Sequence, residues 1–174
     1  MNYWRRILLG IISFAAVGLS TTLSLAAEPL ANGTVSFGQW LPPLDRLTEN
    51  PQGPGRNVNE LAPEVVTIKA GGAINFVISG FHNVQVFDDG TIPEDIGPNP
   101  PVTGSPLGGG IINTSDNLIY RGWDPNLVPD TFQRDRVEVV HFAEPGTYLV
   151  ICGVRAHFVN GMLGYVKVLP GKQK

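Results

Sequence analysis

The chain has 174 residues, a formal net charge of −3 and 43% hydrophobic residues. A mildly acidic surface argues against nucleic acid and anionic lipid as the main partners. After the N-terminal region, no segment of the sequence is long and apolar enough to cross a membrane.

The N-terminus begins with MNYWRR, continues with the apolar run ILLGIISFAAVGL and ends in the small residues LSLAA. This order of basic, apolar and small residues predicts a secretory signal peptide over residues 1–26, cleaved after Ala26. Extended to Ala27, the same run would be an uncleaved membrane anchor of about 20 residues. The polar and small residues of STTLSLAA favour cleavage. We therefore expect an exported protein of the periplasm or a thylakoid-type lumen, held at a membrane only if this segment is retained.

The mature chain, residues 27–174, would be a single domain of about 148 residues, enough for a hydrophobic core without disulfides. Loss of Arg5 and Arg6 with the signal peptide shifts the formal charge from −3 to −5. Between Glu28 and Leu61 the pattern predicts one strand, at VSFGQW, followed by an irregular arm.

Short runs rich in Val, Ile, Phe and Tyr follow, and most are bounded by Gly or Pro. They are EVVTIK, AINFVIS, HNVQVF, RVEVVHF, TYLVIC and MLGYVKVL. Such runs predict β-strands and an all-β sandwich or barrel. The glycines of KAGGA predict that residues 64–69 and 73–79 form a hairpin or a corner between two sheets. EPGT, residues 144–147, has the Pro and Gly of a type II turn, so we expect RVEVVHF and TYLVIC to pair antiparallel.

Between residues 88 and 130 the strand pattern lapses, and 14 of 43 positions are Gly or Pro. A segment of this composition can be disordered. Its apolar residues argue instead for a long insertion that packs on the sandwich, with one or two short strands near 110–121. These residues are Ile111, Ile112, Leu118, Ile119, Tyr120 and Trp123.

The only cysteine, Cys152, lies in the stretch CGVRAHFVNGM. An exported thiol with no cysteine to pair with is open to oxidation unless it is buried or binds something. His157 and Met162 follow it on the same loop. Thiolate, imidazole and thioether form a soft ligand set suited to copper, and a blue-copper centre has two histidines, one cysteine and a weak axial methionine.

The second histidine must come from elsewhere in the chain, where only His82 and His141 remain. His82 begins HNVQVF in line with the apolar Val84 and Val86, as a ligand facing inward at the end of a sandwich would. His141 lies beside the EPGT turn, at the opposite end of the predicted hairpin from the Cys152 loop. The pattern favours His82, although an ordinary buried histidine with a hydrogen bond would look the same when taken alone.

These motifs together resemble the cupredoxins, the small blue-copper proteins. The shared pattern is HNVxVF, then after a long gap FxxPGTYxxxC, then CxxxxHxxxxM followed by GxVxV. HFVNGMLGYVKV is most similar to the rusticyanin and auracyanin members of that family. The similarity runs from Glu64 to Leu169, and residues 88–130 match no element of the family.

The resemblance implies an all-β Greek-key β-sandwich that binds one type 1 copper ion. The implied ligands are the Nδ1 atoms of His82 and His157 and the sulfur atoms of Cys152 and Met162. No other cofactor is implied.

The resemblance also implies roles for two neighbours of His82. The carbonyl of Phe81 would approach the copper, and Asn83 would tie the ligand loops together by hydrogen bonds. The chain departs from the family pattern at Arg155 and Ala156, where many members have Pro-Gly, and at Gly153, where Ser or Thr is common. The first departure puts a charge near the copper, and the second puts one hydrogen bond between the loops in doubt.

The predicted function is that of a one-electron carrier that cycles Cu(II) and Cu(I) and docks transiently with redox protein partners near His157. The alternative is a periplasmic copper-handling protein for storage or delivery, although such proteins favour Met-rich or multi-His sites and this chain has 2 methionines. Its 3 histidines cannot supply the further copper ions of a multicopper oxidase or nitrite reductase. A hydrolase built on Cys152 and His157 lacks an oxyanion-hole signal. We therefore expect no enzyme, no catalytic residue and no small-molecule substrate.

Overall fold

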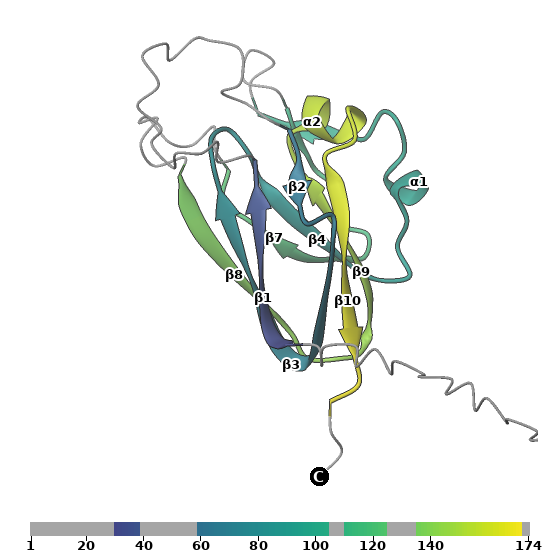
Figure 1. Cartoon of the computed structure of the whole chain (residues 1–174). Helices are drawn as coiled ribbons and strands as arrows, with labels where there is room; N and C mark the ends of the chain where they lie inside the picture. The colour runs from purple at the N-terminus through teal and green to yellow at the C-terminus, as the bar shows by residue number, and fades with distance from the viewer. Residues whose placement is uncertain (1–29, 39–58, 105–109, 125–134, 172–174) are drawn as a thin grey trace, which may run out of the picture.

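The computed structural model describes residues 30–38, 59–104, 110–124 and 135–171 (Figure 1). The predicted signal peptide, its alternative as a membrane anchor and most of the predicted N-terminal arm lie outside these residues. Within the described part of the chain, no helix is long and apolar enough to span a bilayer.

The described residues form ten strands and two short helices. The strands are β1 (Leu30–Phe37), β2 (Leu61–Ala62), β3 (Val65–Ile78), β4 (Val84–Asp89), β5 (Val102–Thr103), β6 (Ile111–Ile112), β7 (Leu118–Arg121), β8 (Arg136–Phe142), β9 (Gly146–Cys152) and β10 (Leu163–Leu169). The helices are α1 (Pro93–Ile96) and α2 (Arg155–Val159).

Strand β3 is 14 residues long and belongs to both layers of a sandwich (Figure 1). Its first half pairs with β10, and its second half pairs with β1 and β8. One layer therefore has the order β2-β1-β3-β8, and the other has the order β3-β10-β9-β4-β7. Because β9 lies between β4 and β10, strands that are distant in sequence are neighbours in space, as in a Greek key. The predicted all-β Greek-key β-sandwich is confirmed.

The bend in β3 lies at the glycines of KAGGA. Gly71 has a φ of +85°, which side chains other than glycine rarely adopt, and a Cβ on Gly72 would overlap the carbonyl of Ala31. Of the two alternatives for residues 64–69 and 73–79, the structure has the corner between sheets.

The predicted pairing of RVEVVHF with TYLVIC is wrong. β8 pairs with β3, whereas β9 pairs with β4 and β10, so the turn at residues 144–147 connects the two layers. The two strands instead meet across the core, where the ring centroids of Phe142 and Tyr148 are 5.1 Å apart. A Pro-Gly turn reverses the chain in both arrangements, so the local sequence does not distinguish a hairpin from a crossover. Cys152 nevertheless ends its strand, as predicted.

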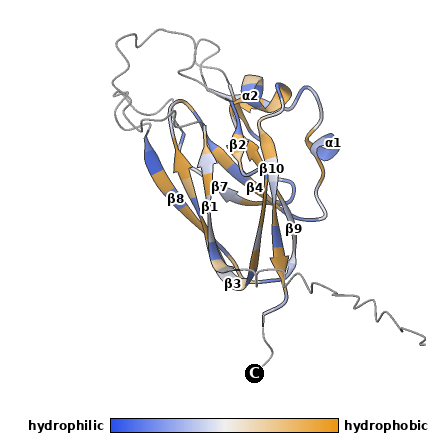
Figure 2. Cartoon of the chain, viewed as in Figure 1, coloured by the Kyte–Doolittle hydropathy of each residue, from blue (hydrophilic) through white to orange (hydrophobic). Residues whose placement is uncertain are grey.

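Apolar side chains from strands of both layers form one buried core cluster. Figure 2 shows hydrophobic residues, in orange, along the strands of both layers. This core includes residues such as Phe37, Ile68 and Phe76, and it also contains Cys152 and Met162. Each fully buried aliphatic or aromatic side chain contributes about 1.5–3 kcal/mol relative to an exposed one. The two sulfur-containing side chains are therefore held in a region that is stabilised by burial.

The insertion covers the outer face of the layer that contains β9. Ile112 of β6 packs with Leu149 and Ile151 of β9 in a second buried cluster, and Leu118 of β7 lies against it. Strand β7 also extends the layer by pairing with β4. β6 and β7 are the short strands predicted near 110–121, and within the described residues the insertion packs on the sandwich as expected.

Candidate metal site

His82 lies in the connection between β3 and β4, and its side chain is fully buried. It precedes β4 by two residues instead of beginning the strand. Its ring makes an edge contact with Phe37, with 6.0 Å between the centroids. A Cβ on Gly38 would lie 2.7 Å from His82 Nε2, so the glycine leaves the space that the imidazole occupies.

Cys152 ends β9 opposite Val84, and its side chain is also fully buried. Burial raises the pKa of the Cys152 thiol to about 12, while hydrogen bonds from the backbone of Asn83 and Val154 act in the opposite direction. At neutral pH the thiol therefore keeps its proton unless a metal ion displaces it. The two explanations for a single cysteine, burial and ligand binding, are compatible in this position.

His157 belongs to α2, which begins three residues after Cys152, and its side chain is half-buried. Burial lowers the pKa of His157. A lower pKa keeps the imidazole neutral, which is the form that binds metal ions.

The donor atoms of these three residues form a small triangle. The two Nδ1 atoms of His82 and His157 are 3.1 Å apart, and Cys152 Sγ is 3.7 Å from the first and 3.6 Å from the second. A metal ion with bonds of about 2.0–2.3 Å to nitrogen and sulfur separates trigonal donors by about 3.5–3.8 Å. The triangle therefore has the size of a site that holds one metal ion. Two imidazoles and one thiolate are a donor set that suits copper.

Met162 is fully buried in the same core cluster as Cys152. Its N–H donates to the carbonyl of His157, and its carbonyl accepts from the N–H of Cys152, both at 3.0 Å. The loop that carries three of the four predicted ligands is thus closed by its own backbone. The role of Met162 as an axial ligand stays a prediction.

His141 does not join these donors. It lies on β8 opposite Ala73, and its side chain is exposed. Among the described residues, the group of His, Cys, Asp and Glu side chains that could hold a metal consists of His82, Cys152 and His157. The geometry thus agrees with the choice of His82 over His141.

Asn83 connects the two segments that carry the donors. Its carbonyl accepts a hydrogen bond of 2.6 Å from the N–H of Gly153. Its side-chain Nδ2 donates to the carbonyls of Gly122, at 2.8 Å, and Trp123, at 2.9 Å. Gly153 has no side chain that could bond to the neighbouring loop, and its backbone N–H makes this connection by donating to the carbonyl of Asn83. The side chain of Asn83 instead bonds to the insertion.

Gln85 occupies the space beside Gly153. Its Nε2 donates to Asn83 Oδ1, at 3.0 Å, and to the carbonyl of Ile112, at 2.8 Å. A Cβ on Gly153 would overlap Asn83 Oδ1 and lie 2.5 Å from Gln85 Nε2. The absence of a side chain at Gly153 thus leaves the space that the amide of Gln85 occupies.

The insertion also contacts the Cys152 loop directly. The N–H of Ile112 donates to the carbonyl of Gly153 at 2.7 Å, and the N–H of Arg155 donates to the carbonyl of Gly110 at 3.0 Å. The guanidinium of Arg155, which is exposed, donates to Asn99 Oδ1 at 3.0 Å. The charge that the sequence places near the copper face is therefore held by the insertion.

Sequence reasoning missed three buried or half-buried polar residues near the donors: Gln85, Arg136 and Glu138. Gln85 is fully buried, and Glu138 is 8% exposed. Gln85 lies among buried apolar residues of β4, and Glu138 shares a face of β8 with Arg136 and two buried apolar residues. The outward Val137 and Val139 of β8 are exposed. A polar residue at an inward position of a predicted strand indicates a buried polar contact, and this pattern could have identified these residues from the sequence.

No protein-family model and no curated protein sequence matches this chain. Solved cupredoxin structures resemble it. Reduced auracyanin from Roseiflexus castenholzii is 19% identical with a TM-score of 0.46, and the match covers 82% of this chain and 100% of that one. Auracyanin B is 18% identical with a TM-score of 0.49, covering 83% and 94% of the two chains. Plastocyanin from Dryopteris crassirhizoma is 18% identical with a TM-score of 0.39, covering 78% and 99%.

All these TM-scores lie below 0.5, and the identities lie below 20%. Likenesses at this level concern the general fold and say nothing about the activity of this chain. The assignment of the site therefore rests on its own donor atoms.

Proposed function

We propose that the protein binds one copper ion through His82, Cys152 and His157, with Met162 as a weak axial ligand, and acts as a one-electron carrier between redox proteins. The observation that carries this proposal is the buried triangle of two Nδ1 atoms and one Sγ atom, with edges of 3.1, 3.6 and 3.7 Å.

Copper bound in this triangle would supply a one-electron couple between Cu(II) and Cu(I). The protein's part is to keep the donors in place in both states. Cys152 and Met162 are held in the core, the N–H of Cys152 donates to the carbonyl of Met162, and the N–H of Met162 donates to the carbonyl of His157, so little atomic movement accompanies a change of charge. A small rearrangement favours fast electron exchange.

The surroundings of the donors favour the less charged Cu(I) state. Cys152 and Met162 have no exposed surface, Phe158 is 7% exposed, and Phe81 packs against the core cluster. An apolar environment disfavours the additional positive charge of Cu(II), and a thioether is a weak ligand for it. Both effects raise the reduction potential.

Electrons would enter and leave at the half-buried edge of His157. This residue lies on α2, whose Val159 is 55% exposed and whose Arg155 is also exposed. An apolar surface with one charge suits short-lived contacts with redox proteins. The protein would be exported, to a periplasm or a similar lumen, and would be held at a membrane only by an uncleaved N-terminal segment.

A role in copper storage or delivery is less well supported by the geometry. A protein that releases its metal to a partner needs donors that the partner can reach. Here the side chains of His82, Cys152 and Met162 are all fully buried.

The decisive test is to add Cu(II) to the purified protein and record the visible spectrum. A site with a copper–thiolate bond gives an intense charge-transfer band, and we expect this band in the wild type. We expect Cys152→Ser and His82→Ala to abolish it. His141→Ala is the matched control and should retain it.

Voltammetry then separates a carrier from other copper proteins. We expect one reversible one-electron wave, with no oxidase activity. Absence of the band in the wild type, or its survival in Cys152→Ser, would overturn the copper assignment. A band without a reversible wave would favour the copper-handling alternative.

A further inference from the structure

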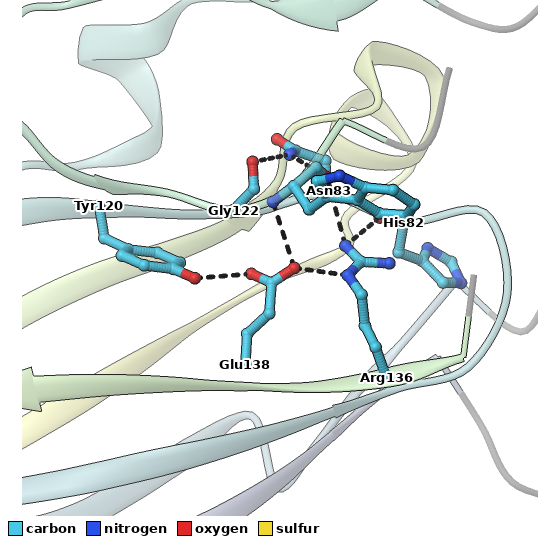
Figure 3. A network of polar contacts seen from close by, with 7 residues as sticks. His82, Asn83, Tyr120, Gly122, Arg136 and Glu138 are labelled. Atoms are coloured by element: carbon cyan, nitrogen blue, oxygen red, sulfur yellow. Dashed lines mark hydrogen bonds and ion pairs between the residues drawn. The ribbon is translucent and has the colours of Figure 1, made fainter. Parts of the chain in front are cut away.

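The start of β8 lies beside residues 80–83, the His82 segment, and contacts it through Arg136 (Figure 3). Arg136 Nη2 donates to the carbonyl of His82 at 3.0 Å and to the carbonyl of Trp123 at 3.3 Å. Its Nε donates to Glu138 Oε1 at 2.6 Å. One guanidinium thus joins a predicted metal ligand, the insertion and a buried carboxylate.

Glu138 fixes the guanidinium from the other side. Its carboxylate accepts from the Tyr120 hydroxyl at 2.9 Å and from the Trp123 N–H at 3.2 Å, in addition to Arg136. Burial and Glu138 raise the pKa of Tyr120 to about 12, so this hydroxyl remains a donor at neutral pH. The ring of Trp123 lies over Arg136, with 5.1 Å from its centroid to Cζ. The side chain of Arg136 is therefore restrained on several sides.

The rest of the His82 segment is held from the same direction. The N–H of Gly80 donates to Asp135 Oδ1 at 3.0 Å, and Asn83 Nδ2 donates to the carbonyls of Gly122 and Trp123. Residues 80–83 are thus bonded to residues 122–123 of the insertion and to residues 135–136, at the start of β8. Figure 3 shows Asn83 bonded to Gly122, and Arg136 placed between His82 and Glu138.

We propose that Arg136 is a positioning residue for His82, and that the Arg136–Glu138 pair sets the local charge beside the copper site. This inference rests on the proposed function, because it takes His82 to be a copper ligand. A guanidinium donates in several fixed directions, so it can bind a carbonyl and a carboxylate at once, which an ammonium on a flexible chain does less well. The two opposite charges balance each other, so the loss of either one leaves a net charge close to the metal.

The charge part of the proposal predicts opposite effects of two neutral substitutions. Arg136→Gln leaves the carboxylate of Glu138, which stabilises Cu(II), with its hydrogen bonds from Tyr120 and Trp123 in place. Glu138→Gln leaves the guanidinium, which stabilises Cu(I). At one fixed applied potential, we expect Arg136→Gln to raise the Cu(II):Cu(I) ratio roughly tenfold and Glu138→Gln to lower it roughly tenfold. The double variant should return toward the wild-type ratio.

The positioning part is tested in the metal-free protein by amide hydrogen exchange. Arg136→Lys keeps the charge but not the fork of donors. We expect it to leave the Cu(II):Cu(I) ratio close to wild type while the amides of Gly80 and His82 exchange at least about tenfold faster. The amides of Leu149 and Tyr165, in β9 and β10, should be unchanged. If Arg136→Gln does not fold, Arg136→Lys still tests the positioning role.

Arg121→Gln is the matched control. Arg121 is exposed on β7, and its guanidinium donates to the carbonyls of Ile112 and Thr114 within the insertion. We expect it to change neither the ratio nor the exchange of residues 80–83.

The positioning role is overturned if Arg136→Lys and Arg121→Gln give the same exchange rates at Gly80 and His82. The charge role is overturned if Arg136→Gln and Glu138→Gln shift the ratio in the same direction or not at all. A wild type that forms no blue copper complex would instead contradict the proposed function, and the exchange experiment, which needs no metal, would still decide whether Arg136 positions His82.

Discussion

The two segments that carry the donor atoms are held by different kinds of contact. The Cys152–Met162 segment closes on itself, because Cys152 and Met162 exchange a backbone hydrogen bond and Met162 bonds back to His157. The bonds of Gly153 to the distant Asn83 and Ile112 are also between backbone groups. The His82 segment is instead held by distant side chains. Asp135 and Arg136, which bond to Gly80 and to the carbonyl of His82, are 55 and 54 residues away from these partners.

This difference determines how each segment responds to mutation. A loop held by its own backbone keeps its shape when distant side chains change. A segment held by distant side chains depends on the packing of the whole sandwich. We therefore expect remote substitutions to move His82 and to leave Cys152 in place, and the following predictions test this contrast.

The largest effect is expected at Gly38, which lies against the His82 ring. A Cβ there would lie 2.6 Å from the carbonyl oxygen of Ser79 and 2.7 Å from His82 Nε2, and Gly38 has a φ of +85°. We expect Gly38→Ala to destabilise the metal-free protein by about 2–4 kcal/mol and to weaken the copper band. Denaturant unfolding and the visible spectrum measure the two effects.

Gly71 is the matched control for Gly38. It has the same φ of +85°, and a Cβ there would meet nothing within 4 Å. Gly71→Ala should cost about 1 kcal/mol through the backbone alone and should leave the spectrum unchanged. Equal losses of stability in Gly38→Ala and Gly71→Ala would show that the His82 ring tolerates crowding. That result would contradict the expected sensitivity of the His82 segment.

A smaller effect is expected at Gly153, beside Cys152. A Cβ there would overlap Asn83 Oδ1 and approach Gln85 Nε2, and both are side-chain atoms that can move. We expect Gly153→Ala to cost about 1–3 kcal/mol and to shift the copper band, because Asn83 connects the two segments.

Gly146, at the other end of β9, provides the control for Gly153. A Cβ on Gly146 would lie 2.8 Å from Asp89 Cγ, so Gly146→Ala introduces similar crowding far from Cys152 along the strand. It should destabilise the protein comparably without a spectral change. A spectral shift in both variants would mean that β9 transmits strain along its length.

The next prediction concerns the stability of the metal-free protein at alkaline pH. The pKa of the Cys152 thiol is about 12 in the folded protein, against an ordinary value of 9.0. Above pH 9 the unfolded chain loses this proton while the folded chain keeps it, so stability falls as the pH rises. Because half of the unfolded thiols are already ionised at pH 9, we expect a loss of about 1 kcal/mol between pH 9 and 10, measured by denaturant unfolding.

Cys152→Ser is the control for this pH dependence and should remove most of the slope. The range ends near pH 10 because Tyr120, whose pKa is raised to about 12 from 10.0, adds a similar loss above it. A slope that persists in Cys152→Ser would assign the effect to other groups.

The smallest effect is expected at Arg155, on the exposed side of α2. Arg155→Gln should slow electron exchange with a small anionic iron complex by about two- to fivefold at low ionic strength, and added salt should reduce the difference. The stability and the spectrum should not change. Lys167→Gln, which removes an exposed charge on β10, is the control and should have no effect on the rate.

Much of the fold could be predicted from the sequence because strand patterns and turn residues are local. Runs such as AINFVIS and TYLVIC became strands, and KAGGA became the corner of β3. The prediction that β8 pairs with β9 was wrong because a Pro-Gly turn is compatible with a hairpin and with a crossover between layers. Which neighbour a strand takes depends on the whole set of strands and not on its own turn.

For the candidate site, the spacing from Cys152 to His157 and Met162 was enough to predict that these residues share one loop, since a few residues of chain keep them close. The choice of His82 followed from its place before a strand with buried residues. The roles of Gln85, Arg136 and Glu138 did not follow, although their polar character at buried strand positions was visible in the sequence.

The sequence by itself determined the strands, the bend at KAGGA and the loop that carries Cys152, because covalent spacing and local conformational preference are sufficient for each. That the bend is a corner between sheets and not a hairpin was decided by the tertiary structure. Only the tertiary structure decided the order of the strands, the place of the insertion and the contacts that hold His82. Those contacts join residues about 40 to 55 positions apart, and only the packing of the two layers brings such residues within hydrogen-bonding distance.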